Sequence, residues 1–381
     1  MSKKENKSTN HNIEFSDSRS LSMIKNNSID LVVTSPPYPM IEMWDSLFAS
    51  LNPDIGDSLN QFNGQRAFEL MNQELDKIWD ELNRVVKASG FVCINIGDAT
   101  RKIGKQFQLY SNHSRITSKF ITLGFQPLPI ALWKKATNAP NKFMGSGMLP
   151  AGAYITLEHE HILVFRKGGK REFNTVDEKS LRNQSAFFWE ERNKWFSDSW
   201  DLIGVRQATN NENVRERNAA YPFELPYRLI NMYSVKGDTV LDPFLGTGTT
   251  TFAAIASERN SIGIEYDTNF STIIINGLRD LCKTANSIIT KRLEDHIMFC
   301  EEYQKEKGPL KYKNECFGFP VMTKQEIDLD LKHISKINST DLGSITAEYQ
   351  PIKFVSHLIE SSVAQYEGPK DDEQDQLSLF N

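Results

Sequence analysis

A short segment, Ser35-Pro36-Pro37-Tyr38, carries residue types that could bind an amino group on a flat ring. It follows the apolar run 29–33, which is typical of a buried strand. Two successive prolines remove two backbone N–H groups, so the chain must leave the sheet in an extended form. Unpaired carbonyl groups then lie beside the Ser35 hydroxyl and the Tyr38 ring, which suits the exocyclic amine of a base. A simple strand-ending turn is the alternative interpretation.

A second segment, Asp242 to Thr250, reads Asp-Pro-Phe-Leu-Gly-Thr-Gly-Thr-Thr. It joins a predicted strand to a predicted helix, and the strand predicted after that helix ends in Glu265. Gly246 and Gly248 would let the backbone approach a ligand closely, and Glu265 is suited to a ribose diol. The competing interpretation is a dinucleotide or triphosphate loop. The segment lacks the third glycine of the former and the Gly-Lys-Ser/Thr of the latter.

Together the two segments resemble the motifs of amino-group DNA methyltransferases. Ser-Pro-Pro-Tyr is similar to the catalytic motif of that family, and Asp-Pro-Phe-x-Gly-x-Gly-Thr-Thr resembles its S-adenosylmethionine loop. The catalytic motif comes first, which is the permuted order of the β-type class, and the resemblance covers about residues 13–280. It implies an α/β, Rossmann-like methyltransferase fold with a largely parallel central sheet, irregular target-recognition insertions and a C-terminal extension.

The resemblance also implies a reaction and a set of site residues. A methyl group would pass from S-adenosylmethionine to the exocyclic amine of a base flipped out of double-stranded DNA. Ser35 and Pro36 would accept the two amine hydrogens, Pro37 would complete the catalytic motif, and Tyr38 would stack on the base. The expected cofactor-binding residues are Asp17, Asp242, Pro243, Phe244, Gly246, Gly248, Thr249, Thr250 and Glu265. Asp17 matches only in part, because Ser16 stands where the family has glycine.

The identity of the target base is a finer question. Serine at the first motif position is more frequent in the cytosine-N4 enzymes of the family, so we expect cytosine N4 and keep adenine N6 as the alternative. A DNA-binding module without catalysis is disfavoured by the intact Ser35, Tyr38, Gly246 and Gly248. The implied biological role is modification within a restriction–modification system.

The elements that must position these residues alternate between strands and helices, which predicts parallel pairing. We divide the chain into a disordered N-terminus (1–12), a catalytic half (13–135), a target-recognition region (136–219) with one core strand (158–167), a cofactor-binding half (220–285), a C-terminal extension (286–365) and a disordered acidic tail (366–381). Residues 53–64 are rich in Asn, Asp and Gly, and we predict a mobile loop there.

Composition narrows the class of protein further. The chain has 381 residues and a net charge of −5, much of it in the acidic tail. No apolar run is long enough to span a bilayer, and residues 1–12 do not form a signal peptide, so we expect a cytoplasmic protein of a bacterium or archaeon. The four cysteines have no paired spacing, which argues against a zinc site and a disulfide framework.

Three smaller features carry predictions of their own. Bases interleaved with aromatics suit phosphate contact, and we predict DNA contacts at Lys142, Lys170, Arg171 and Arg192, with an ordinary surface face as the alternative. We expect His159 and His161 to be structural and no metal to be bound, because no other clustered ligands accompany them in sequence. The tail residues Gln376, Leu377, Leu379 and Phe380 resemble a bacterial sliding-clamp-binding motif, with docking on the chain's own domain as the alternative.

Overall fold

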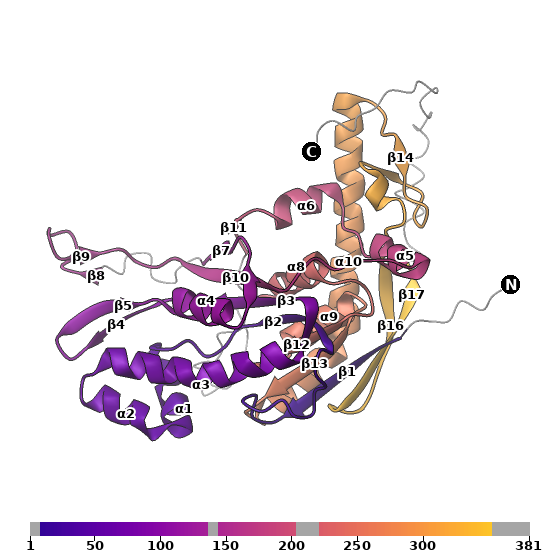
Figure 1. Ribbon diagram of the computed structural model, residues 1–381. Helices are drawn as coiled ribbons and strands as arrows, with labels where there is room; N and C mark the ends of the chain where they lie inside the picture. Colours follow the sequence, from indigo (N-terminus) through magenta and orange to yellow (C-terminus); the bar gives the residue numbers. More distant parts are fainter. Residues whose placement is uncertain (1–7, 136–143, 203–220, 353–381) are drawn as a thin grey trace.

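The computed structural model describes residues 8–135, 144–202 and 221–352, which are organised around one mixed sheet (Figure 1). The strand order is β11-β7-β10-β3-β2-β12-β13-β1-β17-β16, and β6 pairs with β10. Five neighbouring strands in the middle run parallel. They are β3 (Val86–Ile96), β2 (Ile29–Thr34), β12 (Thr239–Asp242), β13 (Asn260–Glu265) and β1 (Ser8–Phe15). The predicted α/β fold with a largely parallel centre is confirmed.

Beyond β3 the pairing becomes antiparallel. The strand β10 (His159–Lys167) pairs with β3 on one side and with β6 (Phe125–Pro127) and β7 (Ala131–Lys134) on the other. The short β11 (Ser199–Trp200) then runs parallel to β7. The core strand predicted over 158–167 corresponds to β10, which lies directly beside β3.

Helices cover both faces of the sheet because successive strand residues point to opposite sides. Val32 packs with α3 (Gly64–Val85) and α4 (Asn112–Thr122) on one face. Its neighbours Leu31 and Val33 pack with α8 (Glu224–Tyr233), α9 (Thr249–Ala256) and part of α10 (Phe270–Lys307) on the other. All six residues of β2 are buried, as expected for a central strand covered on both sides.

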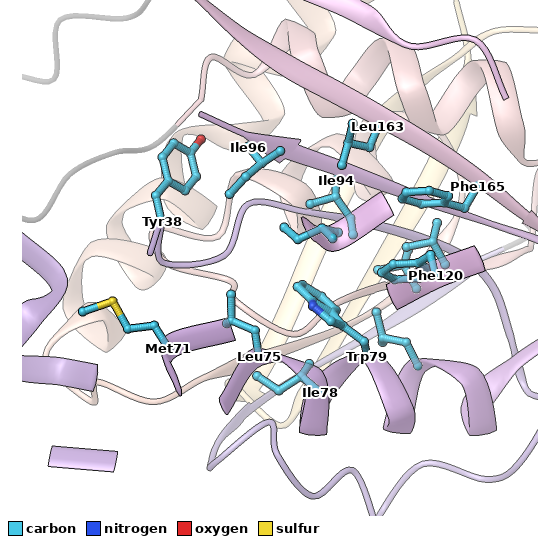
Figure 2. Packing of buried hydrophobic residues seen from close by; sticks show 14 of the residues in the cluster. Tyr38, Met71, Leu75, Ile78, Trp79, Ile94, Ile96, Phe120, Leu163 and Phe165 are labelled. Atoms are coloured by element: carbon cyan, nitrogen blue, oxygen red, sulfur yellow. The ribbon is translucent and has the colours of Figure 1, made fainter. Parts of the chain in front are cut away.

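Aromatic packing fixes the first of these layers (Figure 2). The Trp79 ring on α3 lies 5.6 Å from the Phe120 ring on α4, and Phe120 stacks on Phe165 of β10 at 4.4 Å between centroids. Trp79, Phe120 and Phe165 are almost completely buried. The two helices are thereby held against β3 and β10, the strands that carry polar residues toward the catalytic motif.

The prediction of a mobile loop over 53–64 is wrong, because this segment contains a helix. After η1 (Glu42–Trp44) and α1 (Asp45–Leu51) the chain forms α2 (Pro53–Asn60). Asn52 caps it by accepting the Asp54 N–H at 3.1 Å, with Pro53 in the first turn, and Ile55 is buried. Asn63 caps α3 in the same way. Of the two asparagines in the segment, Asn60 ends α2 and Asn63 is the cap of α3.

The C-terminal extension belongs to the sheet. The 38 residues of α10 run without a break across our predicted boundary at 285/286. They lead to β14 (Tyr312–Lys313), β15 (Pro320–Val321), η2 (Lys324–Glu326), β16 (Lys332–Asp341) and β17 (Ser344–Pro351). Because β17 pairs antiparallel with β1, the hairpin of β16 and β17 adds two strands to the edge of the central sheet.

Two further helices and two hairpins complete the described chain. The helices α5 (Val176–Gln184) and α6 (Trp189–Trp195) lie in the predicted target-recognition region, and the residues flanking them pack toward the extension. The hairpins β4–β5 (Ala99–Ile103, Gln106–Tyr110) and β8–β9 (Met144–Gly145, Ala153–Tyr154) project side by side from the sheet (Figure 1). Within 8–135, 144–202 and 221–352, no helix has both the length and the apolar character to cross a membrane.

Candidate active site

A cleft of about 570 Å³ opens at the carboxyl ends of the parallel strands. Its walls come from the carboxyl ends of four strands: 17–19 after β1, 35–37 after β2, 243–247 and Thr249 after β12, and 265–270 at the end of β13. Residues 43–51 of η1 and α1 close it from one side with Met43, Leu47 and Phe48. Ligands of parallel α/β sheets bind at this edge, so the topology brings both sequence motifs to one site.

The catalytic motif ends in a hydrogen-bond network around Tyr38. The Ser35 and Tyr38 hydroxyl oxygens lie 3.0 Å apart, and Tyr38 donates to Glu160 Oε2 at 2.8 Å. Asn95 Nδ2 donates to both Tyr38 Oη and Glu160 Oε2, at 2.8 and 2.6 Å. Lys135 forms an ion pair with the other oxygen of Glu160. Burial, and then the charge of Glu160, raises the pKa of Tyr38 well above its usual value, so the phenol stays protonated.

Sequence reasoning missed Asn95, Lys135 and Glu160. Asn95 comes from β3, Glu160 from β10, and Lys135 directly follows β7. They meet because β10 pairs with both β3 and β7. One signal was present in the sequence. Because successive side chains of a strand point to opposite faces, Glu160 had to lie on the other face of the sheet from His159 and His161. The partner of Glu160 depends on strand pairing, which the sequence does not state.

The ring of Tyr38 is buried, with 7% of the residue exposed. It packs against Gly97, where an added Cβ would lie 3.0 Å from the ring atom Cε2. A larger residue at position 97 would therefore displace the ring. Stacking of Tyr38 on a flipped base stays a prediction.

The cofactor loop approaches the cleft through Gly246. This residue has a φ of +56°, and a Cβ built on it would meet no protein atom within 4 Å. Its N–H donates to Glu265 Oε2 at 2.7 Å, while Oε1 accepts the Asp267 N–H at 2.8 Å. Burial raises the pKa of Glu265 above its usual value. The open space beside a backbone without a side chain, next to a carboxylate with spare lone pairs, fits a ligand that carries a ribose.

Asp242 lies beneath this loop and does not line the cleft. Its carboxylate accepts hydrogen bonds from Thr34 and Thr250 at 2.6 Å each, and also from Tyr221. Burial raises the pKa of Asp242. These bonds argue against the predicted direct contacts of Asp242 and Thr250 with the cofactor. They tie the end of β2, next to Ser35, to the strand that carries the cofactor loop.

The remaining predicted cofactor residues fall into two groups. Pro243, Phe244, Thr249 and Asp17 line the cleft. Gly248, with a φ of +89°, is the N-cap residue just before α9 and lies against the Phe252 ring. The carboxylate of Asp17 forms an ion pair with Arg19 at 2.7 Å, and Arg19 also reaches Glu74 on α3 at 2.8 Å. Arg19, which the motif comparison did not single out, therefore lies at the same wall of the cleft.

His161 has neighbours that its sequence position did not reveal. His113 donates from Nδ1 to Asp98 at 2.7 Å, and its ring stacks on that of His161 with centroids 4.0 Å apart. The expectation that no other ligand-type residues gather beside His161 is wrong, because α4 begins next to the carboxyl end of β3. Asp98 also accepts the His113 backbone N–H at the start of α4, which gives this carboxylate a role as a helix cap.

The predicted DNA-contact residues are scattered. Lys142 lies outside the described residues, and Arg192 is exposed on α6. Arg171 forms an ion pair with Asp238 at 2.7 Å and approaches Asp30 at 3.9 Å, at the amino ends of β12 and β2. This edge is opposite the cleft, so the structure argues against a DNA contact at Arg171, and Lys170 adjoins it. By contrast, the exposed Lys102 and Lys105 lie on β4–β5, beyond the catalytic edge.

Comparisons with known proteins show the family of this chain. The N6/N4 methyltransferase family, described as DNA methylase, matches residues 29–276, a range that contains both motifs and Glu265. The type II methyltransferase M.MthZI of Methanothermobacter thermautotrophicus is 52% identical over 350 residues, which are 91% of this chain and 97% of that protein. M.MjaI of Methanocaldococcus jannaschii is 49% identical over 277 residues, covering 70% of this chain and 90% of that protein.

A solved structure gives the same result for the fold. TTHA0409 of Thermus thermophilus, described as a DNA modification methylase and crystallised with S-adenosyl-L-methionine, has a TM-score of 0.53 and 30% sequence identity. The match covers 69% of this chain and 92% of that one.

Proposed function

Because the chain belongs to the N6/N4 family of DNA methylases, we propose that it is a type II modification methyltransferase that acts on cytosine N4 in double-stranded DNA. Its cofactor is S-adenosylmethionine, which, when bound, supplies a methyl group on an electrophilic sulfonium. The observation that carries the proposal is the position of Ser35 on the wall of the cofactor cleft, with its hydroxyl 3.0 Å from a buried phenol.

The catalytic task of the protein is to make a weak nucleophile react. The lone pair of an exocyclic amine is delocalised into the ring of the base, so the nitrogen is planar and poorly nucleophilic. If Ser35 Oγ and the Pro36 carbonyl accept its two hydrogens, the nitrogen is drawn toward tetrahedral geometry and the lone pair becomes available. Holding that nitrogen beside the cleft supplies the remaining acceleration through orientation. An amine inside a duplex cannot reach the cleft, so the base must leave the stack.

The cofactor residues divide by their place in the structure. We assign cofactor contact to Gly246, Thr249, Glu265 and Asp17, together with Pro243 and Phe244, because all of them line the cleft. Asp242, Gly248 and Thr250 shape the loop from behind, since Asp242 accepts a hydrogen bond from Thr250 and Gly248 is the N-cap residue of α9. A ribose diol at Glu265 would add hydrogen bonds to a carboxylate that already holds two backbone N–H groups.

The test of the reaction is the chemical identity of its product. Purified protein is incubated with unmethylated plasmid and S-adenosylmethionine, the DNA is digested to nucleosides, and the modified nucleoside is identified by its mass and retention. We expect N4-methylcytosine, because serine occupies the first position of the catalytic motif. N6-methyladenine would overturn the choice of base and leave the methylase assignment intact. No modified base from a folded, cofactor-binding protein on mixed-sequence DNA would overturn both.

DNA must approach the carboxyl edge, where Ser35 lies, and this gives a second prediction. Lys102→Gln/Lys105→Gln should reduce the slope of log affinity against log salt by about 0.9 for each phosphate that the protein no longer neutralises. Lys170→Gln is the matched control, since this exposed lysine lies next to the Arg171 cluster at the opposite edge. Affinity is measured by fluorescence anisotropy over a salt series. A flattened slope for the control and an unchanged one for the β4–β5 variant would move the DNA surface to the amino edge.

The sliding-clamp hypothesis rests on the sequence of the tail alone. Gln376, Leu377, Leu379 and Phe380 lie outside the described residues. The interaction stays a prediction, and a fluorescence titration of the tail peptide against a bacterial sliding clamp would refute it by showing no binding.

A further inference from the structure

The network behind Ser35 has a direction. The Glu160 carboxylate can only accept, and both Tyr38 and Asn95 donate to its Oε2. The single hydrogen of the Tyr38 hydroxyl is therefore directed to Glu160. The hydroxyl next to it, Ser35, must then be the donor across the 3.0 Å between the two oxygens. Asn95 Nδ2 also donates to Ser35 Oγ, at the long distance of 3.5 Å. The remaining lone pair of Ser35, which lines the cleft, is left as the acceptor for a substrate hydrogen.

The proposed reaction produces a proton that needs an acceptor. Formation of the N–CH₃ bond and cleavage of the S–CH₃ bond leave the exocyclic nitrogen with two hydrogens, one methyl group and a positive charge. One N–H bond must then break to give the neutral methylamino base. Ser35 contacts that hydrogen but cannot keep the proton, because a protonated alcohol is a very strong acid. The proton must move on from Ser35.

The chain of hydroxyl groups from Ser35 through Tyr38 ends at the carboxylate of Glu160. Glu160 is 8% exposed, so its carboxylate is largely shielded from water on the side of Tyr38. Its other oxygen forms the ion pair with Lys135, whose side chain is 39% exposed. Lys135 thus lies between the carboxylate and solvent, and it stabilises the ionised form that must be present before reaction. After reaction the same pair offers the proton a way to bulk water.

From this geometry, and resting on the proposed methyl transfer, we propose that Glu160 is the terminal proton acceptor of a relay that runs through Ser35 and Tyr38. As the N–H bond breaks, its proton passes to Ser35 Oγ, the Ser35 proton to Tyr38 Oη, and the Tyr38 proton to Glu160. The two hydroxyls are regenerated and only the carboxylate changes its charge. The high pKa of Tyr38 fits a conduit that is never left ionised. Asn95 acts as a positioning residue by holding Tyr38 and Glu160 together.

The experiment measures single-turnover methyl transfer with saturating cofactor and DNA, so that binding does not enter the rate. Glu160→Gln and Tyr38→Phe keep the shape of the site and each interrupt the relay. Each should lower the rate constant by about 100-fold, within the range of general base catalysis, with unchanged cofactor and DNA affinity. The double variant should lose no more than either single one, because both residues serve one path. Glu158→Gln, the same change at an exposed position on the approach to β10, should match wild type.

A pH–rate profile separates the relay from a structural role. The wild-type rate should fall on the acidic side as the acceptor takes up a proton, and this limb should be absent in Glu160→Gln. The titratable groups that face Glu160 are Lys135, Tyr38 and His161, and Tyr221 faces Tyr38. An acidic limb that persists in Glu160→Gln, additive losses in the double variant, or a folded Glu160→Gln protein with the wild-type rate constant would each overturn the relay. A wild-type protein that forms no methylated base would instead overturn the proposed function.

Discussion

Replacing Ser35 by alanine is expected to reduce the rate of methyl transfer by about 10²–10³-fold, the effect seen when one positioned hydrogen-bonding group is removed from a reaction centre. The hydroxyl is the atom on the cleft wall that can accept an amine hydrogen and pass a proton inward. Alanine leaves the nitrogen planar and disconnects Tyr38 from the substrate. Tyr38→Ala should show a loss of similar size, since it removes the next hydroxyl and the ring together.

Cofactor affinity should change little in Ser35→Ala, because the side chain's contacts are to Tyr38 and Asn95. The loss of one hydrogen bond should lower the free energy of unfolding by only about 1 kcal/mol. Single-turnover rates and calorimetric titration with the cofactor are the two measurements. Ser50→Ala, on the exposed side of α1, is the matched control. Wild-type rates in both Ser35→Ala and Tyr38→Ala would place the reaction elsewhere in the molecule.

Replacing Gly246 by valine is expected to weaken the binding of S-adenosylmethionine by roughly 100-fold or more. The new side chain would project into space that the protein leaves open beside Glu265, where we place the ribose. A penalty of about 3 kcal/mol for displacing the ligand corresponds to a loss of affinity of roughly 100-fold or more. Valine also introduces backbone strain of about 1–3 kcal/mol at a φ of +56°. The two effects must be separated, because strain alone could loosen the loop.

Gly237→Val provides that separation. Gly237 has a φ of +82° and equally open surroundings, but it lies before β12, away from the cleft. Both variants should lose a similar amount of thermal stability, and only Gly246→Val should lose the cofactor in calorimetry. Unchanged affinity in a folded Gly246→Val protein would refute the assignment of this loop, while loss in both variants would mean that strain, not contact, decides.

The fold class and the two motifs were predictable because each depends on local signals. A β-branched run that ends in Pro-Pro, and a glycine-rich turn between strand and helix, identify their own elements and the edge where they lie. The Asn52-Pro53 pair is also a local signal, because it is typical of the start of a helix. The prediction of a loop over 53–64 gave more weight to the composition of the segment than to this pair. The alternation of Ile345, Ala347 and Tyr349, all buried, likewise marks β17.

The remainder depends on pairing over long distances in sequence. Nothing near Glu160 indicates that Tyr38 is its partner, since the contact follows from the position of β10 beside β3. Charge patterning predicted a basic surface at Arg171, but could not tell which edge of the sheet it would reach or that two aspartates lie there. The ion pair between Glu191 of α6 and Arg292 of α10 was unpredictable for the same reason, because the two residues are 101 positions apart in sequence.

The hydrogen bond from Thr34 to Asp242 joins residues 208 positions apart, and this has a consequence for biosynthesis. At a ribosomal rate of about 5–20 residues per second, the nascent chain carries β2 for roughly 10–40 s before β12 emerges to pair with it. During that interval the catalytic motif exists with one edge of its strand exposed, in need of protection from aggregation. An interrupted translation product that ends before β12 thus contains Ser35 without the loop of Gly246, and we expect no methyl transfer from such a fragment.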